Sequence, residues 1–102
     1  MDIDALEKML ARGQDSAMLR LTLGNAYLRR GERETALRHL REAVRLDPNY
    51  SAAWKGLGRL LAETGCPEEA LETYRQGLAV AERHGDMQVV RELRVFIRRL
   101  ER

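Results

Sequence analysis

Residues 51–58 read Ser-Ala-Ala-Trp-Lys-Gly-Leu-Gly, and the stretch that stands 34 positions earlier, residues 17–24, reads Ala-Met-Leu-Arg-Leu-Thr-Leu-Gly. When residues 17–50 are aligned with residues 51–84, most pairs keep size or polarity and several are identical. The identical pairs are Leu23/Leu57, Gly24/Gly58, Gly31/Gly65, Glu34/Glu68, Ala36/Ala70, Leu37/Leu71 and Arg41/Arg75. Two copies at one fixed spacing indicate an internal repeat, in which each copy is one supersecondary unit.

The pattern inside the copies resembles the tetratricopeptide repeat, a helix-turn-helix unit with this period. The second copy carries Trp54-x-x-Leu57-Gly58-x-x-Leu61 and Ala70-x-x-x-Tyr74; the first carries Leu23-Gly24-x-x-Tyr27, Ala36-x-x-x-Leu40 and Pro48. The sequence departs from the family pattern at three points. Arg20 stands where the pattern has a large apolar residue, Leu61 replaces an aromatic residue, and the second copy ends without a proline. The last departure predicts that the helix after Pro67 runs past its usual length.

The resemblance implies an all-α fold, with helix-turn-helix repeats stacked as a short right-handed α-solenoid. We expect about six helices that cover roughly four fifths of the chain, well above the usual third. At 102 residues the chain is predicted to be a single domain. Its parts are an N-terminal capping helix in residues 1–15, repeats in residues 17–50 and 51–84, and a C-terminal capping helix in residues 85–102.

Apolar residues at helical spacing mark the two outer helices. The N-terminal stripe consists of Ile3, Leu6, Met9 and Leu10, and the C-terminal stripe consists of Val90, Leu93, Phe96, Ile97 and Leu100. Terminal units of a repeat array need such caps because each repeat otherwise leaves an apolar face uncovered. We therefore predict that both stripes pack onto the repeats.

Glycines in the first helix of each repeat predict close helix packing. Glycine inside a helix costs about 0.5 to 1 kcal/mol relative to alanine, so an offsetting interaction is expected. With no side chain at Gly24 or Gly58, the following helix, which carries Ala36 or Ala70, can approach closely. Gly56 is expected to lie off this face, where the glycine is either simply tolerated or leaves room for a ligand.

Catalysis finds little support in the sequence. His39 and His84 are the only histidines, and neither has a second ligand at metal-binding spacing. Cys66 precedes a helix start, but Glu68 and Glu69 oppose a thiolate there. The glycines form no phosphate-binding loop. We expect no enzyme activity, no metal and no cofactor.

Composition and termini suggest a cytoplasmic protein. Apolar residues make up 44% and charged residues 33% of the chain, with a net charge of +2, which is typical of a folded, soluble domain. The single cysteine cannot form an internal disulfide, and the first residues do not form a secretory signal. No apolar run reaches the ~18 residues of a membrane span.

The family resemblance implies a concave peptide-binding groove built from the first helix of each repeat. The implied groove residues are Leu21, Thr22, Asn25, Arg29, Lys55, Gly56, Arg59 and Glu63. A subfamily that grips acidic chaperone tails would have a lysine at Leu21 and an asparagine at Gly56, so only Asn25 matches it. Lys55 and Arg59 leave a looser preference for an acidic segment.

Three classes of function stay open. The first is a protein-interaction module or adaptor that binds a peptide segment of a partner in its groove. The second is a self-associating structural module, a homo-oligomer, because residues 1–15 carry a net charge of −2 and residues 91–102 a net charge of +3. The third and least favoured is nucleic-acid binding through the arginine-rich C-terminal helix.

Overall fold

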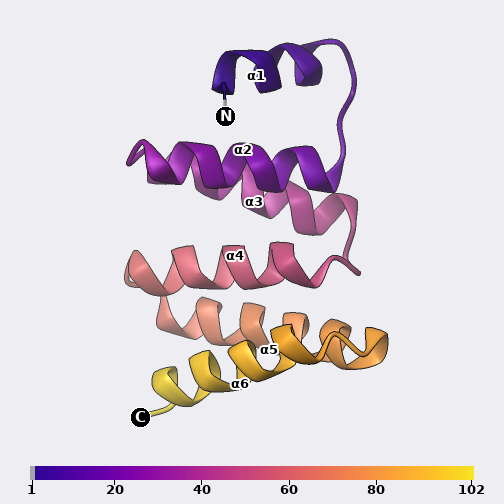
Figure 1. The fold of residues 1–102 in the computed structure, drawn as a ribbon. Helices are drawn as coiled ribbons and strands as arrows, with labels where there is room; N and C mark the ends of the chain where they lie inside the picture. Colours follow the sequence, from indigo (N-terminus) through magenta and orange to yellow (C-terminus); the bar gives the residue numbers. More distant parts are fainter. Residues whose placement is uncertain (1) are drawn as a thin grey trace. The chain divides into compact units, whose positions relative to one another are not determined.

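The fold consists of six α-helices connected by short turns (Figure 1). A computed structural model describes residues 2–102, and within that range it contains no β-strand. The helices are α1 (Ile3–Ala11), α2 (Ala17–Arg29), α3 (Arg33–Leu46), α4 (Ser51–Glu63), α5 (Pro67–His84) and α6 (Met87–Leu100). They hold about four fifths of the chain, which confirms the all-α prediction.

The chain forms two compact units that meet in sequence at the Asp47-Pro48 peptide. The first unit contains α1, α2 and α3, and the second contains α4, α5 and α6. In each unit a helix hairpin forms the centre, α2 with α3 and α4 with α5 (Figure 1). The boundary lies close to the predicted end of the first repeat, because proline cannot extend α3. The assignment of residues 1–102 to a single domain stays a prediction.

The same turn closes both hairpins. Gly31 and Gly65 adopt left-handed φ angles of 77° and 82°, which glycine reaches without the steric cost of a side chain. The residue after each glycine donates its backbone N–H to a carbonyl five positions earlier, from Glu32 to Tyr27 (3.0 Å) and from Cys66 to Leu61 (2.9 Å). These bonds satisfy carbonyls at the helix end. The repeat identified in the sequence is therefore a repeat of backbone geometry.

Gly24 and Gly58 lie at the helix-helix contacts, as predicted. A Cβ atom at Gly24 would lie 2.8 Å from the end of the Leu40 side chain, and one at Gly58 would lie 2.5 Å from the ring of Tyr74. Leu40 and Tyr74 occupy equivalent places in α3 and α5, and both are almost fully buried. The absence of a side chain at each glycine therefore lets the second helix of the hairpin approach.

An apolar cluster holds α1 against the first hairpin. The cluster contains Ile3, Leu6, Leu19, Leu23 and Ala26, with Leu10 and Tyr27 packed against it. The capping stripe predicted for the N-terminal helix is correct at three of its positions. Met9 was wrongly predicted to belong to it: its side chain is 39% exposed, because the nine-residue helix turns this position towards solvent.

The C-terminal helix α6 packs onto α5 and α4, as the capping prediction required. Val90 and Leu93 are fully buried, and Phe96, Ile97 and Leu100 are half-buried in the same cluster as Tyr74. The helix after Pro67 does run on: α5 has 18 residues, compared with 14 in α3.

One packing glycine was not predicted from the sequence. A Cβ atom at Gly77 of α5 would lie 2.7 Å from Cβ of Trp54 and 3.2 Å from Cδ1 of Leu93. Gly77 is therefore the point at which the three helices of the second unit meet. In the first unit the equivalent positions are Ala43 and Arg20, so a larger residue is accommodated where tryptophan is absent.

Candidate functional site

The predicted groove residues of the first unit lie along one side of α2. Leu21, Thr22 and Asn25 are half-buried, and Arg29 is exposed. The Thr22 hydroxyl donates a 2.8 Å hydrogen bond to the Met18 carbonyl, so its hydrogen is already used. The Asn25 amide forms no hydrogen bond with any residue from 2 to 102. Asn25 therefore keeps both a donor and an acceptor available to a ligand.

The predicted groove residues of the second unit differ in availability. Lys55 is ion-paired with Glu92 of α6, with its Nζ 3.2 Å from both carboxylate oxygens. Arg59 and Glu63 are exposed, and Gly56 is half-buried. The pairing of Lys55 could not be read from the sequence because Glu92 lies 37 positions away on the capping helix. The charge of Lys55 is therefore partly used in holding α6.

Arg59 and Glu63 line a hollow of about 260 Å³ in the second unit, which we call the α4–α6 hollow. Its lining comprises Arg59, Ala62, Glu63, Tyr74, Phe96, Arg99 and Leu100. The guanidinium carbons of Arg59 and Arg99 lie 5.8 Å and 6.0 Å from the centre of the Phe96 ring. The sequence analysis placed Phe96 and Leu100 in a capping stripe, and it assigned Tyr74 and Arg99 no part in a site.

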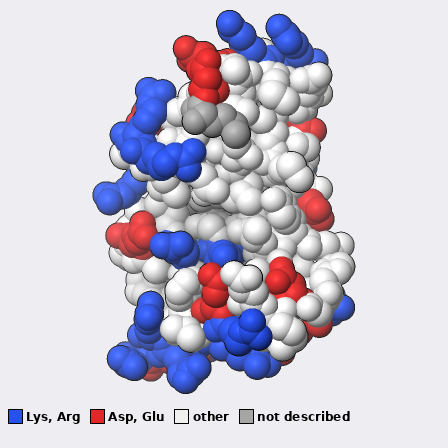
Figure 2. All heavy atoms as spheres, in the orientation of Figure 1, with Lys and Arg blue, Asp and Glu red and all other residues white. Residues whose placement is uncertain are grey.

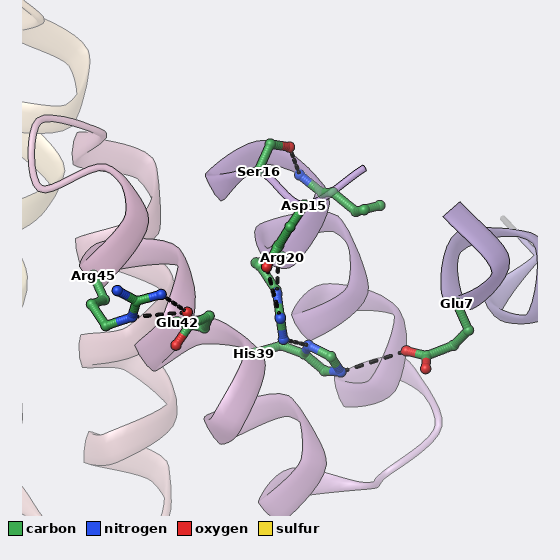
Figure 3. Close-up of polar contacts among 8 residues, drawn as sticks. Glu7, Asp15, Ser16, Arg20, His39, Glu42 and Arg45 are labelled. Atoms are coloured by element: carbon green, nitrogen blue, oxygen red, sulfur yellow. Dashed lines mark hydrogen bonds and ion pairs between the residues drawn. The ribbon is translucent and has the colours of Figure 1, made fainter. Parts of the chain in front are cut away.

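Arg20, which stands where the family pattern has a large apolar residue, belongs to a polar network in the first unit (Figure 3). The Arg20 guanidinium donates to both carboxylate oxygens of Asp15, at 2.8 Å and 3.0 Å. It also contacts Nδ1 of His39 at 3.2 Å, and the other ring nitrogen of His39 lies 3.6 Å from Oε1 of Glu7. The network links α1, α2 and α3, so its role is structural.

The geometry defines the protonation state of His39. A guanidinium can only donate, so Nδ1 of His39 must accept, and the neutral ring carries its hydrogen on Nε2, which faces Glu7. Burial and the charge of Arg20 lower the pKa of His39 below its ordinary 6.5, although Glu7 opposes the shift. The ring also stacks on Tyr27, with centroids 5.5 Å apart. His39 is therefore a neutral packing residue at pH 7.

The candidate catalytic and metal-ligating side chains of the sequence analysis lie apart from one another along the described chain. No group of three or more His, Cys, Asp or Glu side chains within residues 2–102 could hold a metal ion. Cys66 is exposed at the start of α5, next to Glu68 and Glu69 and without a neighbouring histidine. None of the described helices is long and apolar enough to cross a membrane. What remains is a set of unpaired polar side chains on the first helices of the two hairpins.

Repeated helix hairpins with packing glycines define a helical-repeat protein. Residues 21–86 match the model of the tetratricopeptide repeat family. The chain belongs to the tetratricopeptide repeat family.

Several proteins are similar to this chain over most of its length. The TPR repeat-containing protein PA0015 of Pseudomonas aeruginosa is 48% identical over 102 residues, which cover 100% of this chain and 97% of that protein. The solution structure of protein BPP2914 from Bordetella parapertussis is similar to this protein, with a TM-score of 0.83 and 46% sequence identity. The match covers 99% of this chain and 88% of the BPP2914 chain. The crystal structure of a tetratricopeptide repeat domain protein from Salinibacter ruber has a TM-score of 0.81 and 28% sequence identity to this protein. The match covers 85% of this chain and 97% of the Salinibacter chain.

Proposed function

We propose that this protein is an interaction module that binds an extended or short helical segment of a partner protein, with contact residues on the first helix of each hairpin, α2 and α4. Tetratricopeptide repeats mediate protein-protein interaction in general, and family membership supports that class of function here. The proposed contact residues are Leu21, Thr22, Asn25, Arg29, Lys55, Arg59 and Glu63.

The availability of Asn25 is the observation that carries this proposal. A half-buried amide without a protein partner has lost part of its hydration and gains from a ligand that supplies a donor and an acceptor. A peptide unit supplies both, irrespective of side chain. Arg59 adds an exposed guanidinium without an ion pair among residues 2–102. These two residues therefore suit a peptide that carries acidic groups.

The expected affinity is modest. Exposed charge pairs contribute only about 0 to 1 kcal/mol each and affect the association rate more than the affinity. Two repeats offer few contact positions, so we expect a dissociation constant in the micromolar range or weaker, about −8 kcal/mol.

Structural observations give the two alternatives less support. On the face shown in Figure 2, acidic and basic side chains are interspersed, which does not favour a nucleic-acid footprint. Arg94 of α6 is paired with Glu82 at 3.0 Å, and Glu101 near the end of the chain pairs with Arg75 at 2.8 Å. Self-association through the oppositely charged ends stays an alternative, and concentration-dependent mass measurements would detect it.

The test is amide-shift mapping by NMR with a peptide selected from a random display library against the full chain. We expect shifts at Asn25, Arg29 and Arg59, and weaker binding by Asn25→Ala. Gln14→Ala, which removes an exposed amide from the turn before α2, is the matched control. Shifts confined to α3 and α5, at Arg38, Arg41, Glu72 and Arg75, would place recognition on the other helices and contradict the proposal.

A further inference from the structure

We propose that the α4–α6 hollow binds the carboxylate of an aspartate or glutamate side chain of the partner peptide, together with the apolar residue next to it. The carboxylate lies between Arg59 and Arg99, and the apolar side chain lies against Phe96. This inference rests on the proposed function and names the chemistry of one of its subsites.

Two unpaired cations are held at the hollow by one aromatic ring. Arg59 comes from α4 and Arg99 from α6; both are exposed, and neither forms an ion pair with any residue from 2 to 102. Contact with an aromatic ring restricts a guanidinium, while its N–H donors point outward in the guanidinium's own plane and remain available. Because less side-chain freedom is then lost on binding, these arginines are better prepared for a carboxylate than a freely moving lysine.

The Tyr74 hydroxyl adds a third donor. Tyr74 lines the hollow, and only 3% of its surface is exposed. Its hydroxyl forms no hydrogen bond with any of the described residues. Burial raises the pKa of Tyr74, so the hydroxyl stays protonated and can donate at neutral pH. The equivalent residue in the first unit is Leu40, which makes this donor specific to the second unit.

The size and remaining charge of the hollow limit its occupant. About 260 Å³ is below the usual 300 to 1,000 Å³ of small-molecule pockets, so one or two side chains fit better than a cofactor. Phe96, Leu100 and Ala62 supply apolar surface for a neighbouring side chain. Glu63 on the lining leaves a net charge of +1 among the three ionised groups, which favours a single carboxylate over a multiply charged phosphate.

The test uses the full chain and two capped tripeptides, acetyl-Leu-Glu-Leu-amide and acetyl-Leu-Gln-Leu-amide, which differ by one charge. Each is titrated to about 10 mM, which detects millimolar dissociation constants, while NMR follows the Arg59 and Arg99 side-chain Nε signals and the Phe96 amide. We expect the glutamate peptide to bind about two- to fivefold more tightly, the effect of an exposed ion pair. Arg59→Gln and Arg99→Gln should abolish the difference, and Tyr74→Phe should weaken binding of the glutamate peptide.

Arg91→Gln is the matched control, because it removes one positive charge from the same helix outside the hollow. Equal affinity for the two peptides, shifts away from the hollow, or an equal effect of Arg91→Gln and Arg99→Gln would overturn the inference. If a selected partner shifts Asn25, Arg29 and Arg59 while Arg99 and Phe96 stay silent, the proposed function holds and this inference fails. If the hollow prefers the glutamate peptide but no selected peptide shifts α2, the subsite stands and the proposed function fails.

Discussion

Replacing Gly58 with alanine tests the packing of the second hairpin most directly. The new Cβ atom would lie 2.5 Å from Cδ1 and Cε1 of Tyr74, closer than side-chain carbons approach one another. Tyr74 is 97% buried and lies against Phe96, with ring centroids 5.5 Å apart, so it has little room to move. Overpacking of this kind costs about 1 to 3 kcal/mol.

The helix itself gains from the same change, because alanine is favoured over glycine by about 0.8 to 1 kcal/mol in a helix. The free-energy cost of overpacking at Gly58 should lie near the upper end of the range of about 1 to 3 kcal/mol, because the new Cβ atom would clash with a rigid ring. We therefore expect Gly58→Ala to lower the free energy of unfolding by about 1 to 2 kcal/mol. Gly24→Ala should cost less, because the far end of Leu40 can rotate away.

The assay is urea unfolding followed by circular dichroism, with Gly56→Ala as the control on the same helix. Gly56 is only half-buried, so its replacement should be neutral or stabilising by up to about 1 kcal/mol. The double variant Gly58→Ala/Tyr74→Leu, which copies the leucine of the first hairpin, should recover part of the loss. Equal midpoints for Gly58→Ala and Gly56→Ala would refute the assigned contact, and so would a double variant that is less stable than the sum of its single changes.

Three further predictions concern the two units. Gly77→Ala should lower the urea midpoint, because its Cβ would lie 2.7 Å from Trp54 and 3.2 Å from Leu93; an unchanged midpoint would show that these residues can move aside. The folded state depresses the pKa of His39, so the unfolded chain binds the proton more readily and stability should fall as pH drops below about 6.5. Urea midpoints at pH 7.5 and 5.5 measure this loss, which His39→Gln should reduce; an equal loss in the variant would place the titration elsewhere. Deleting residues 91–102 removes Leu93, which is fully buried, and the half-buried Phe96, Ile97 and Leu100. Full burial of one such side chain is worth about 1.5 to 3 kcal/mol, so the shortened chain should unfold or aggregate; unchanged melting of a monomer would show that this segment is dispensable.

The pH dependence of stability predicted for His39 can be distinguished from that of two acidic side chains in the first unit. Arg20 lowers the pKa of Asp15 below 3.8, and Arg45 lowers the pKa of Glu42 below 4.5. Stability from these carboxylates is present above their unfolded values and is lost only as pH falls through the lower folded ones. Both stay ionised between pH 7.5 and 5.5, so they do not contribute to a change in that window, and comparison with His39→Gln isolates the part that is due to His39.

The sequence by itself determined the repeat, the helix ends and the closely packed glycines. The period of 34 residues, the left-handed turns at Gly31 and Gly65, and the contacts at Gly24 and Gly58 depend on interactions within one hairpin. Such interactions recur at fixed spacing along the chain, so a pattern reveals them. Asn25 and Arg59 could likewise be placed on the first helices from the repeat alone.

Only the tertiary structure decided which charges are free. Lys55 is paired with Glu92, 37 positions away, while Arg59 and Arg99 share the Phe96 ring beside the Tyr74 hydroxyl. The structure also joins Glu7, Arg20 and His39 from three helices into one network. The 34-residue period describes the repeats and does not report which side chains of the C-terminal helix dock against which residues of the second hairpin. Free and occupied charges look identical in a sequence, because pairing depends on side-chain positions that packing in three dimensions defines.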